Sequence, residues 1–152
     1  NYWRFGDYLG IGAGAHGKVT DAASRVVVRT ARVRQPGRYL AAARPEDRVD
    51  EMRTVAARDL PFEFCLNVLR LVEGFDAALF EERTGLAWSA IEVPLAAAQR
   101  RGLIEPAAGG RWAPTALGQR FLNDLQALFL AEGGAADGHR DGPAIASAAR
   151  MG

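Results

Sequence analysis

The hydrophobic pattern of the chain changes at residue 60, and this change limits the possible folds more than any other feature. Residues 25–34 are rich in β-branched side chains and partly alternate between apolar and polar, which is typical of a strand or a hairpin arm. After residue 60 the apolar residues recur at i, i+3, i+4 and i+7, starting with residues 62–72, and this period indicates helices. The sequence therefore predicts an α+β chain in which the strands precede the helices.

Residues 1–43 are predicted to hold the strands. Residues 7–11 have the pattern of a short strand that runs into glycines, and Gln35-Pro36-Gly37 ends the strand of residues 25–34. Residues 39–43 fit one helical turn.

Two stretches lack the pattern of a folded core. Charged residues dominate residues 44–59, which we interpret as a linker followed by a solvent-exposed helix over residues 46–58. Residues 132–152 consist mostly of Gly, Ala, Asp and Ser without periodicity, and we expect them to form a flexible tail.

Residues 60–131 are predicted to form a mainly helical domain of winged-helix-like order, with three helices, a hairpin and a closing helix. Asp76 is placed to cap the second helix and Gly85 to end it. Ser89 and Glu92 have the spacing of a capping box at the start of the third helix. The hairpin turn and the final N-cap are expected at Gly109-Gly110 and Thr115.

The sharpest local feature is a glycine loop that follows the first predicted strand. Gly12, Gly14 and Gly17 have the spacing of the dinucleotide-binding fingerprint. A Rossmann unit requires a helix directly after this loop, because the helix N-terminus holds the pyrophosphate, whereas residues 18–21 lead into β-type sequence. The Rossmann interpretation is therefore disfavoured. Two others stay open: a loop whose backbone N–H groups approach a ligand, and a tight structural turn at a sheet edge.

The cysteine and histidine content limits the metal chemistry of the chain. The single cysteine, Cys65, excludes an internal disulfide, fits a reducing cytosol and lies on an apolar helix face, where we expect it to be buried. With His16 and His139 it cannot complete a zinc site of nitrogen and sulfur ligands only, or a four-cysteine iron–sulfur cluster. His16 lies in the glycine loop and either contacts a ligand or a metal or is an ordinary hydrogen-bonded residue.

Basic residues are concentrated in the N-terminal part, where residues 1–59 carry 11 basic and 7 acidic side chains. Residues 18–38 hold six basic side chains and one acid, Asp21. Arginines at alternate positions of a strand share a sheet face, so this segment either binds carboxylates or phosphates or forms a solvated face. Its basic residues are Lys18, Arg25, Arg29, Arg32, Arg34 and Arg38.

A winged-helix-like order makes a DNA-binding regulator one alternative. Residues 60–131, however, carry six basic and eight acidic side chains, and the expected reading helix over residues 89–98 has no Arg, Lys, Asn or Gln to read bases. We therefore expect no nucleic-acid partner. No apolar run approaches the roughly 18 residues of a membrane span, so no integral membrane segment is expected either.

Several segments, taken together, resemble a known family. Tyr2-Trp3 and residues 6–17 are similar to the late part of HemW-type heme chaperones, a family related to oxygen-independent coproporphyrinogen III oxidase within the radical SAM superfamily. The resemblance covers roughly residues 2–130, and its specificity lies in the combination of segments. The segments similar to the family's C-terminal domain in order and spacing are 60–64, 67–71, 80–85, 101–103 and 117–123.

The resemblance implies a partial (β/α) radical SAM barrel, of which residues 1–43 would be the final part. It also implies a [4Fe–4S] cluster on a CxxxCxxC motif with S-adenosylmethionine beside it, and those cysteines are absent from this chain. Because the sequence starts at Asn1 without Met, we expect it to be a piece of a longer protein. The family's heme motif, His-Asn-x-x-Tyr-Trp, would end at Tyr2 and Trp3.

The resemblance also implies where cofactors bind. In the related oxidases the glycine loop lies along the S-adenosylmethionine pocket, so backbone contacts are expected from this loop, and flat aromatic rings suit a tetrapyrrole. The expected cofactor-binding residues are Tyr2, Trp3, Gly10, Gly12, Ala13, Gly14, Ala15 and His16.

The expected function is that of a heme chaperone, which binds heme and passes it to acceptor hemoproteins in the cytoplasm. The alternative is the oxidase itself, which decarboxylates propionate side chains through a radical formed with S-adenosylmethionine. Because the cluster ligands are missing, this chain alone is expected to be catalytically silent. Whether the longer protein forms a homodimer stays open.

Overall fold

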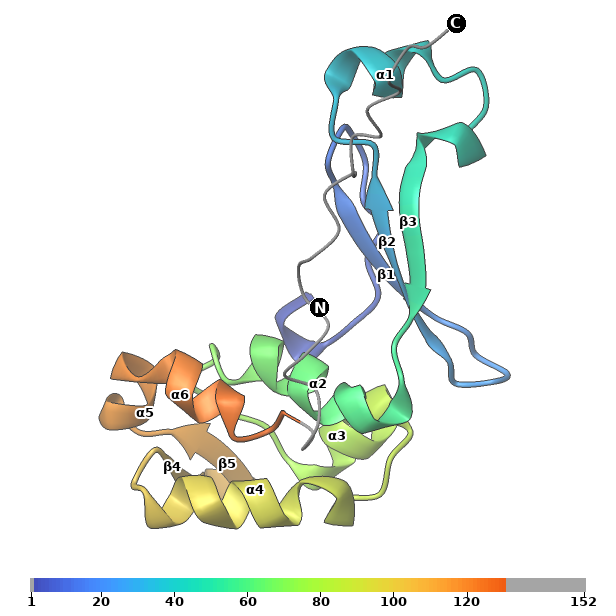
Figure 1. The fold of residues 1–152 in the computed structure, drawn as a ribbon. Coiled ribbons are helices and arrows are strands. Elements are labelled where there is room, and N and C mark those ends of the chain that lie inside the picture. Colours follow the sequence, from blue (N-terminus) through green and yellow to red (C-terminus); the bar gives the residue numbers. More distant parts are fainter. Residues whose placement is uncertain (1, 131–152) are drawn as a thin grey trace, which may run out of the picture.

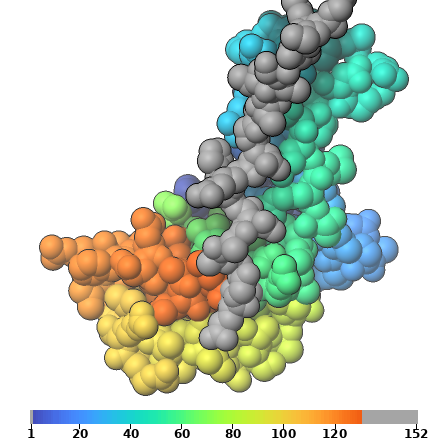
Figure 2. Space-filling model, in the orientation of Figure 1, coloured from blue at the N-terminus to red at the C-terminus, as the bar shows by residue number. Residues whose placement is uncertain are grey.

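The computed structural model describes residues 2–130, and the expected tail over residues 132–152 lies outside this range. An antiparallel sheet stands on a mainly helical base (Figure 1). In Figure 2, the yellow and orange surface of the C-terminal helices forms this base, and the strands project from it. The prediction of an α+β chain is confirmed: the three-stranded sheet precedes the mainly helical part, which itself holds a two-stranded hairpin.

The sheet has three antiparallel strands in the order β1-β2-β3: β1 (His16–Thr20), β2 (Val27–Arg32) and β3 (Val49–Thr54). Lys18 pairs with Arg29, and Arg29 pairs with Arg53. Because directly paired residues point to the same face, the three basic side chains lie on one face of the sheet. Strands of a (β/α) barrel are parallel, and a barrel remnant is not seen in residues 2–130.

The expected helix over residues 46–58 is wrong. Only a short 3-10 helix, η2 (Glu46–Arg48), precedes strand β3, and a second one, η3 (Ala57–Asp59), follows it. Five of the six residues of β3 are exposed, and charged side chains suit an exposed edge strand as well as a solvated helix. Backbone pairing with β2 decides between the two, and no local pattern reveals this pairing.

Two smaller expectations in the N-terminal part also need correction. The strand expected over residues 7–11 is reduced to a single bridge between Tyr8 and Lys18. The helical turn expected over residues 39–43 begins earlier, as helix α1 (Pro36–Ala41), because Pro36 supplies the fixed φ that suits a first helical turn.

The helical base follows the predicted order of three helices, a hairpin and a closing helical segment. The structure divides this last segment at Phe121, whose φ of −110° and ψ of 44° are not helical. The elements are α2 (Leu60–Val68), α3 (Ala77–Thr84), α4 (Ser89–Arg100), β4 (Ile104–Ala107), η4 (Ala108–Gly110), β5 (Arg111–Pro114), α5 (Ala116–Arg120) and α6 (Leu122–Ala127).

Both N-caps predicted from single residues are confirmed. The carboxylate of Asp76 accepts a hydrogen bond from the backbone N–H of Leu79 at 2.8 Å, and the hydroxyl of Thr115 accepts one from Gly118 at 3.0 Å. Gly85 ends α3 with a φ of 73°, in the left-handed region that glycine adopts without strain.

The capping box expected at Ser89 is wrong. Ser89 is the first residue inside α4, and the N-cap position is taken by Trp88, which makes no side-chain cap. The backbone N–H of Trp88 instead donates to Glu81 of α3 at 2.9 Å. A partner from another helix thus replaces the local cap.

The core joins the base to the sheet. The rings of Phe75 and Phe80 pack edge-on against Phe64 at 5.3 and 5.2 Å between centroids. The buried residue Val27 brings β2 into the same cluster. Cys65 is buried as predicted, and burial raises the pKa of its thiol well above the ordinary value, so it stays protonated.

No helix within residues 2–130 is both long enough and apolar enough to cross a membrane.

Candidate functional site

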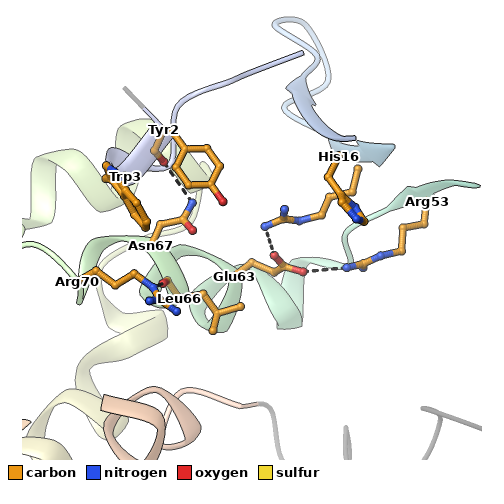
Figure 3. Close-up of a pocket in the computed structure, with 9 residues that line it drawn as sticks. Tyr2, Trp3, His16, Arg53, Glu63, Leu66, Asn67 and Arg70 are labelled. Carbon is orange, nitrogen blue, oxygen red and sulfur yellow. Dashed lines mark hydrogen bonds and ion pairs between the residues drawn. The ribbon is translucent and has the colours of Figure 1, made fainter. Parts of the chain in front are cut away.

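A hollow of about 490 Å³ lies where the sheet meets helix α2 (Figure 3). We call it the junction hollow. Its size falls in the range of small-molecule sites, and it combines aromatic, basic and polar side chains. Three segments far apart in the sequence build it: the N-terminal 3-10 helix η1 (Tyr2–Arg4), the sheet, and α2 with the turn that follows. The lining residues are Tyr2, Trp3, His16, Arg29, Arg53, Glu63, Leu66, Asn67 and Arg70.

Aromatic rings from η1 form one side of the hollow. Tyr2 and Trp3 pack edge to face at 5.0 Å between ring centroids, and Tyr2 makes a second edge contact with Tyr8 at 4.7 Å. The side-chain amide of Asn67 donates to the carbonyl of Tyr2 at 3.3 Å, which ties η1 to α2. Tyr2 and Trp3 are nevertheless 42% and 48% exposed, so apolar ring surface faces the hollow and the solvent.

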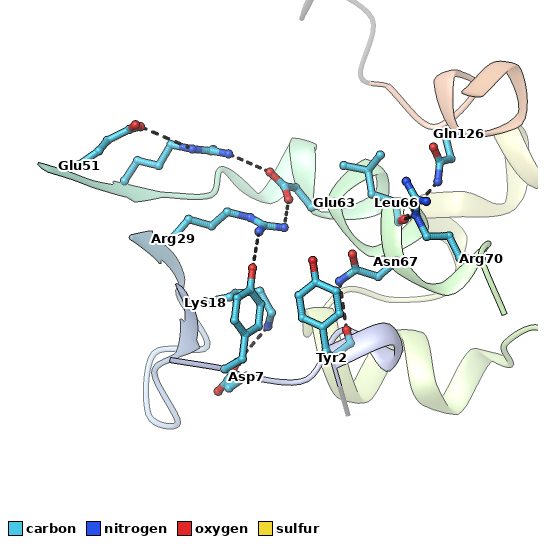
Figure 4. Close-up of polar contacts among 12 residues, drawn as sticks. Tyr2, Asp7, Lys18, Arg29, Glu51, Glu63, Leu66, Asn67, Arg70 and Gln126 are labelled. Atoms are coloured by element: carbon cyan, nitrogen blue, oxygen red, sulfur yellow. Dashed lines mark hydrogen bonds and ion pairs between the residues drawn. The ribbon is translucent and has the colours of Figure 1, made fainter. Parts of the chain in front are cut away.

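A buried carboxylate organises the opposite side. Glu63 accepts hydrogen bonds from Arg29 of β2 and from Arg53 of β3, the latter at 3.0 Å (Figure 4). Its side chain is only 10% exposed, and a carboxylate in that position needs such partners. Arg29 also donates to the hydroxyl of Tyr8 at 3.1 Å, while burial raises the pKa of Tyr8 above its ordinary value. The arginines are therefore held in fixed positions across the sheet face.

Arg70 differs from the other two arginines of the hollow. Its Nε donates to the backbone carbonyl of Leu66 at 3.1 Å, and its guanidinium carbon lies 5.9 Å from the centre of the Trp3 ring. Within residues 2–130, no carboxylate forms a salt bridge with Arg70. Three arginines and one glutamate line the hollow, so basic side chains outnumber acidic ones there.

The structure brings together only some of the expected cofactor-binding residues. Tyr2, Trp3 and His16 line the junction hollow. Figure 3 places the two aromatic side chains on one side of it and His16 on the other, beside Arg53. The five others, which do not line the hollow, are Gly10, Gly12, Ala13, Gly14 and Ala15.

The backbone of the glycine loop is bonded mainly to the sheet. Gly14 donates to the carbonyl of Val33 at 2.9 Å, and Ala15 accepts from Arg32 at 2.8 Å. Gly12, with a φ of 104°, donates to the Tyr39 hydroxyl at 3.2 Å. A β-carbon at Gly10 would lie 2.4 Å from the carbonyl oxygen of His16, so only glycine fits there. These contacts agree with the structural-turn alternative, and a ligand role for the loop stays a prediction.

Most of the charged lining was not predicted from the sequence. Of the six basic residues of segment 18–38, only Arg29 lines the hollow. Arg53 lies on the strand that was expected to be a helix, so its pairing opposite Arg29 could not be foreseen. Glu63 and Asn67 offered one signal: they are polar residues within an apolar helix, and both are buried.

The described residues do not fit a protein-bound metal cluster. No group of three or more His, Cys, Asp or Glu side chains that could hold a metal ion occurs within residues 2–130. Strand β1 begins at His16, so the glycine loop is followed by a strand, and the dinucleotide-binding arrangement is excluded.

Comparisons with known proteins confirm the family resemblance. Residues 55–121 match the family model described as the HemN C-terminal domain. The chain is 44% identical over 137 residues to the heme chaperone HemW of Escherichia coli. It is 41% identical over 133 residues to that of Haemophilus influenzae, and 34% identical over 130 residues to that of Buchnera aphidicola from Acyrthosiphon pisum.

These alignments cover 86–87% of this chain and 33% of each relative, so the chain spans about a third of the length of the curated relatives it matches. No solved structure shows significant similarity to it.

Proposed function

We propose that this chain, whose residues 55–121 belong to the HemN C-terminal domain family, is the part of a heme chaperone that lines its heme site. The observation that carries this proposal is the junction hollow, in which two exposed aromatic rings, a histidine and three arginines meet. The relatives named as heme chaperones add independent support.

The chemistry of the lining matches the chemistry of heme. Heme is a flat, largely apolar ring system, and the exposed faces of Tyr2 and Trp3 offer it stacking surface that would otherwise stay in water. Heme also carries anionic propionates, which favour a basic lining. The imidazole of His16 is a nitrogen donor within the same hollow. The chain thereby binds heme reversibly as cargo and passes it to acceptor hemoproteins.

The [4Fe–4S] cluster and S-adenosylmethionine implied by the resemblance belong to the rest of the longer protein in this proposal. The chain holds one cysteine, Cys65, and that side chain is fully buried, so the residues present do not fit a four-cysteine cluster. No step proposed for this chain depends on either group. Three expectations stay predictions: a partial radical SAM barrel of which residues 1–43 would be the final part, a winged-helix-like domain over residues 60–131, and a cytoplasmic location. Whether the longer protein forms a homodimer stays open.

Heme transfer is the direct test of the function. Full-length protein containing these residues is loaded with hemin, freed of unbound hemin by gel filtration, and mixed with an apo-hemoprotein such as apomyoglobin. Growth of the Soret band of the acceptor measures transfer. We expect stoichiometric loading followed by transfer. Failure to load, or loading without transfer, would contradict the chaperone proposal.

The same preparation separates the chaperone from the oxidase. Incubation with coproporphyrinogen and S-adenosylmethionine under reducing, anaerobic conditions is expected to leave the substrate unchanged. Decarboxylated product would favour the oxidase instead. No observation in residues 2–130 favours that activity, and the relatives reported above are named as chaperones.

A further inference from the structure

We propose that the arginines of the junction hollow, with Arg70 foremost, bind the propionate carboxylates of the heme, and that Glu63 holds Arg29 and Arg53 in position for them. This inference rests on the proposed function and names the part of the ligand that the charged side of the hollow recognises. It concerns residues that neither the glycine loop nor the aromatic motif contains.

Arg29 and Arg53 come first, because they act as a pair. Their guanidinium groups come from neighbouring strands at directly paired positions, and both contact the single carboxylate of Glu63. Glu63 thus shares one negative charge between two guanidinium groups, while Glu51, the second carboxylate near Arg53, is 63% exposed and lies 3.9 Å away. Because Glu63 is nearly buried on helix α2, the two guanidinium groups have fixed positions on the wall of the hollow.

The second step is the free charge of Arg70. Its Nε is fixed by the Leu66 carbonyl, which aims the planar guanidinium beside Trp3, and no described carboxylate neutralises it. A guanidinium with free N–H groups in a fork matches a carboxylate in a two-point contact. Its place beside Trp3 means that a ring lying against this aromatic would bring its own carboxylates within reach of Arg70.

The third step is selectivity. The lining holds three arginines against one glutamate, so its charge is opposite in sign to the propionates of heme. A carboxylate that enters the hollow replaces water around Arg70, and a neutral ester of the same ring system cannot make this contact. The hollow should therefore distinguish the free acid of a tetrapyrrole from its ester, although both offer the same ring for stacking.

The experiment compares hemin with hemin dimethyl ester, both delivered from dimethyl sulfoxide, on full-length protein. Affinity is measured by quenching of tryptophan fluorescence and by the Soret shift. The variants are Arg70→Gln, Arg70→Lys and the control Arg100→Gln, which alters an exposed arginine of α4 outside the hollow. Thermal unfolding of each variant checks that it folds as the wild type does.

The expected result is that the substitutions of Arg70 weaken the binding of hemin but not that of its ester. Arg70→Gln weakens hemin binding about ten-fold, as expected for the loss of one charge-assisted contact, and Arg70→Lys weakens it less. The ester binds the wild type about as weakly as hemin binds Arg70→Gln, and neither Arg70 variant changes ester binding. Arg100→Gln changes the affinity for neither ligand.

The contradicting results separate the two proposals. The carboxylate inference is wrong, while heme binding stands, if the wild type binds hemin and its ester equally well. The same holds if Arg70→Gln binds hemin as tightly as Arg100→Gln does. If the wild type binds neither ligand, the proposed function fails and the inference falls with it.

Discussion

The ammonium nitrogen of Lys18 lies 4.1 Å from the centre of the Phe5 ring, and the lysine side chain is only 1% exposed. Phe5 in turn packs edge-on against Phe64 in the core of the base, at 5.8 Å between centroids. Asp7 accepts a hydrogen bond from the same ammonium at 2.9 Å. This contact chain ties strand β1 to the helical base.

Asp7 should therefore matter more to stability than its partly exposed side chain suggests. Asp7→Asn removes the counter-charge of a buried ammonium, and we expect it to lower the free energy of unfolding by about 1–3 kcal/mol. In the double variant with Lys18→Met the buried charge is gone, so the loss should be smaller than in Asp7→Asn alone. Urea unfolding of the wild type, Asp7→Asn and the double variant measures these differences. A double variant less stable than Asp7→Asn would contradict this account.

The same pair predicts an acid-dependent stability. Burial acts to raise the pKa of Asp7, but hydrogen bonds from Thr20 and Lys18 outweigh it and hold this pKa below its ordinary value of 3.8. Between the lowered pKa and 3.8 the unfolded chain binds more protons than the folded one, so stability rises with pH there. The contribution is fully present above about pH 4 and is lost as the pH falls through the folded pKa.

Urea unfolding of wild type and Asp7→Asn between pH 2 and 6 isolates this contribution. The stability difference between the two proteins should shrink as the solution becomes more acidic. A difference that stays constant over the whole range would show that Asp7 does not act through its charge.

Glu63 and Glu51 form a matched pair of carboxylates, since both face Arg53. Glu63 is 10% exposed and binds two arginines, whereas Glu51 is 63% exposed and lies 3.9 Å from Arg53. We expect Glu63→Gln to lower the free energy of unfolding by about 1–3 kcal/mol, because two charged donors lose their acceptor. Glu51→Gln should change it by less than about 0.5 kcal/mol. Equal effects in thermal or urea unfolding would argue against the role given to Glu63.

Alanine substitutions at Gly118 of α5 and Gly37 of α1 should have different effects on stability. A β-carbon at Gly118 would lie 1.8 Å from the carbonyl oxygen of Leu103, which is backbone and cannot yield, so Gly118→Ala should cost at least about 2 kcal/mol. At Gly37 in α1 nothing lies within 4 Å of the added carbon. Gly37→Ala should be neutral or stabilise by up to about 1 kcal/mol. Circular-dichroism melting curves measure both variants. A Gly37→Ala variant that melts below Gly118→Ala would contradict this prediction.

The helical base could be predicted because its signals are local. Asp76, Thr115 and Gly85 act on backbone groups within one turn, so their chemistry can be read from adjacent residues. Strand β3 could not be predicted, since its exposed, charged residues fit a solvated helix equally well until β2 supplies hydrogen bonds. Ser89 failed as a cap for a similar reason, because the backbone N–H of Trp88 found its acceptor on another helix.

The junction hollow was only partly predictable for the same physical reason. Tyr2 and Trp3 were expected from the family resemblance and His16 from its place in the glycine loop, and the structure brings all three to one site. Arg53 and Arg70 carry no local signal of function, because their position depends on the strand register and on the packing of η1 against α2. The glycine loop is the opposite case. Its motif is conspicuous in the sequence, but its backbone groups bond largely to the neighbouring strand segment of its own sheet.

The most direct measurement of the central claim is a hemin titration, followed at the Soret band, of full-length wild type, Trp3→Ala and Phe121→Ala. Trp3 and Phe121 are 48% and 45% exposed, and only Trp3 lines the hollow, so the two truncations are matched in exposure. The account predicts a roughly ten-fold weaker affinity for Trp3→Ala, because a stacking surface is lost, and no change for Phe121→Ala. Equal affinities for all three proteins would show that heme, if it binds, does not bind in the junction hollow.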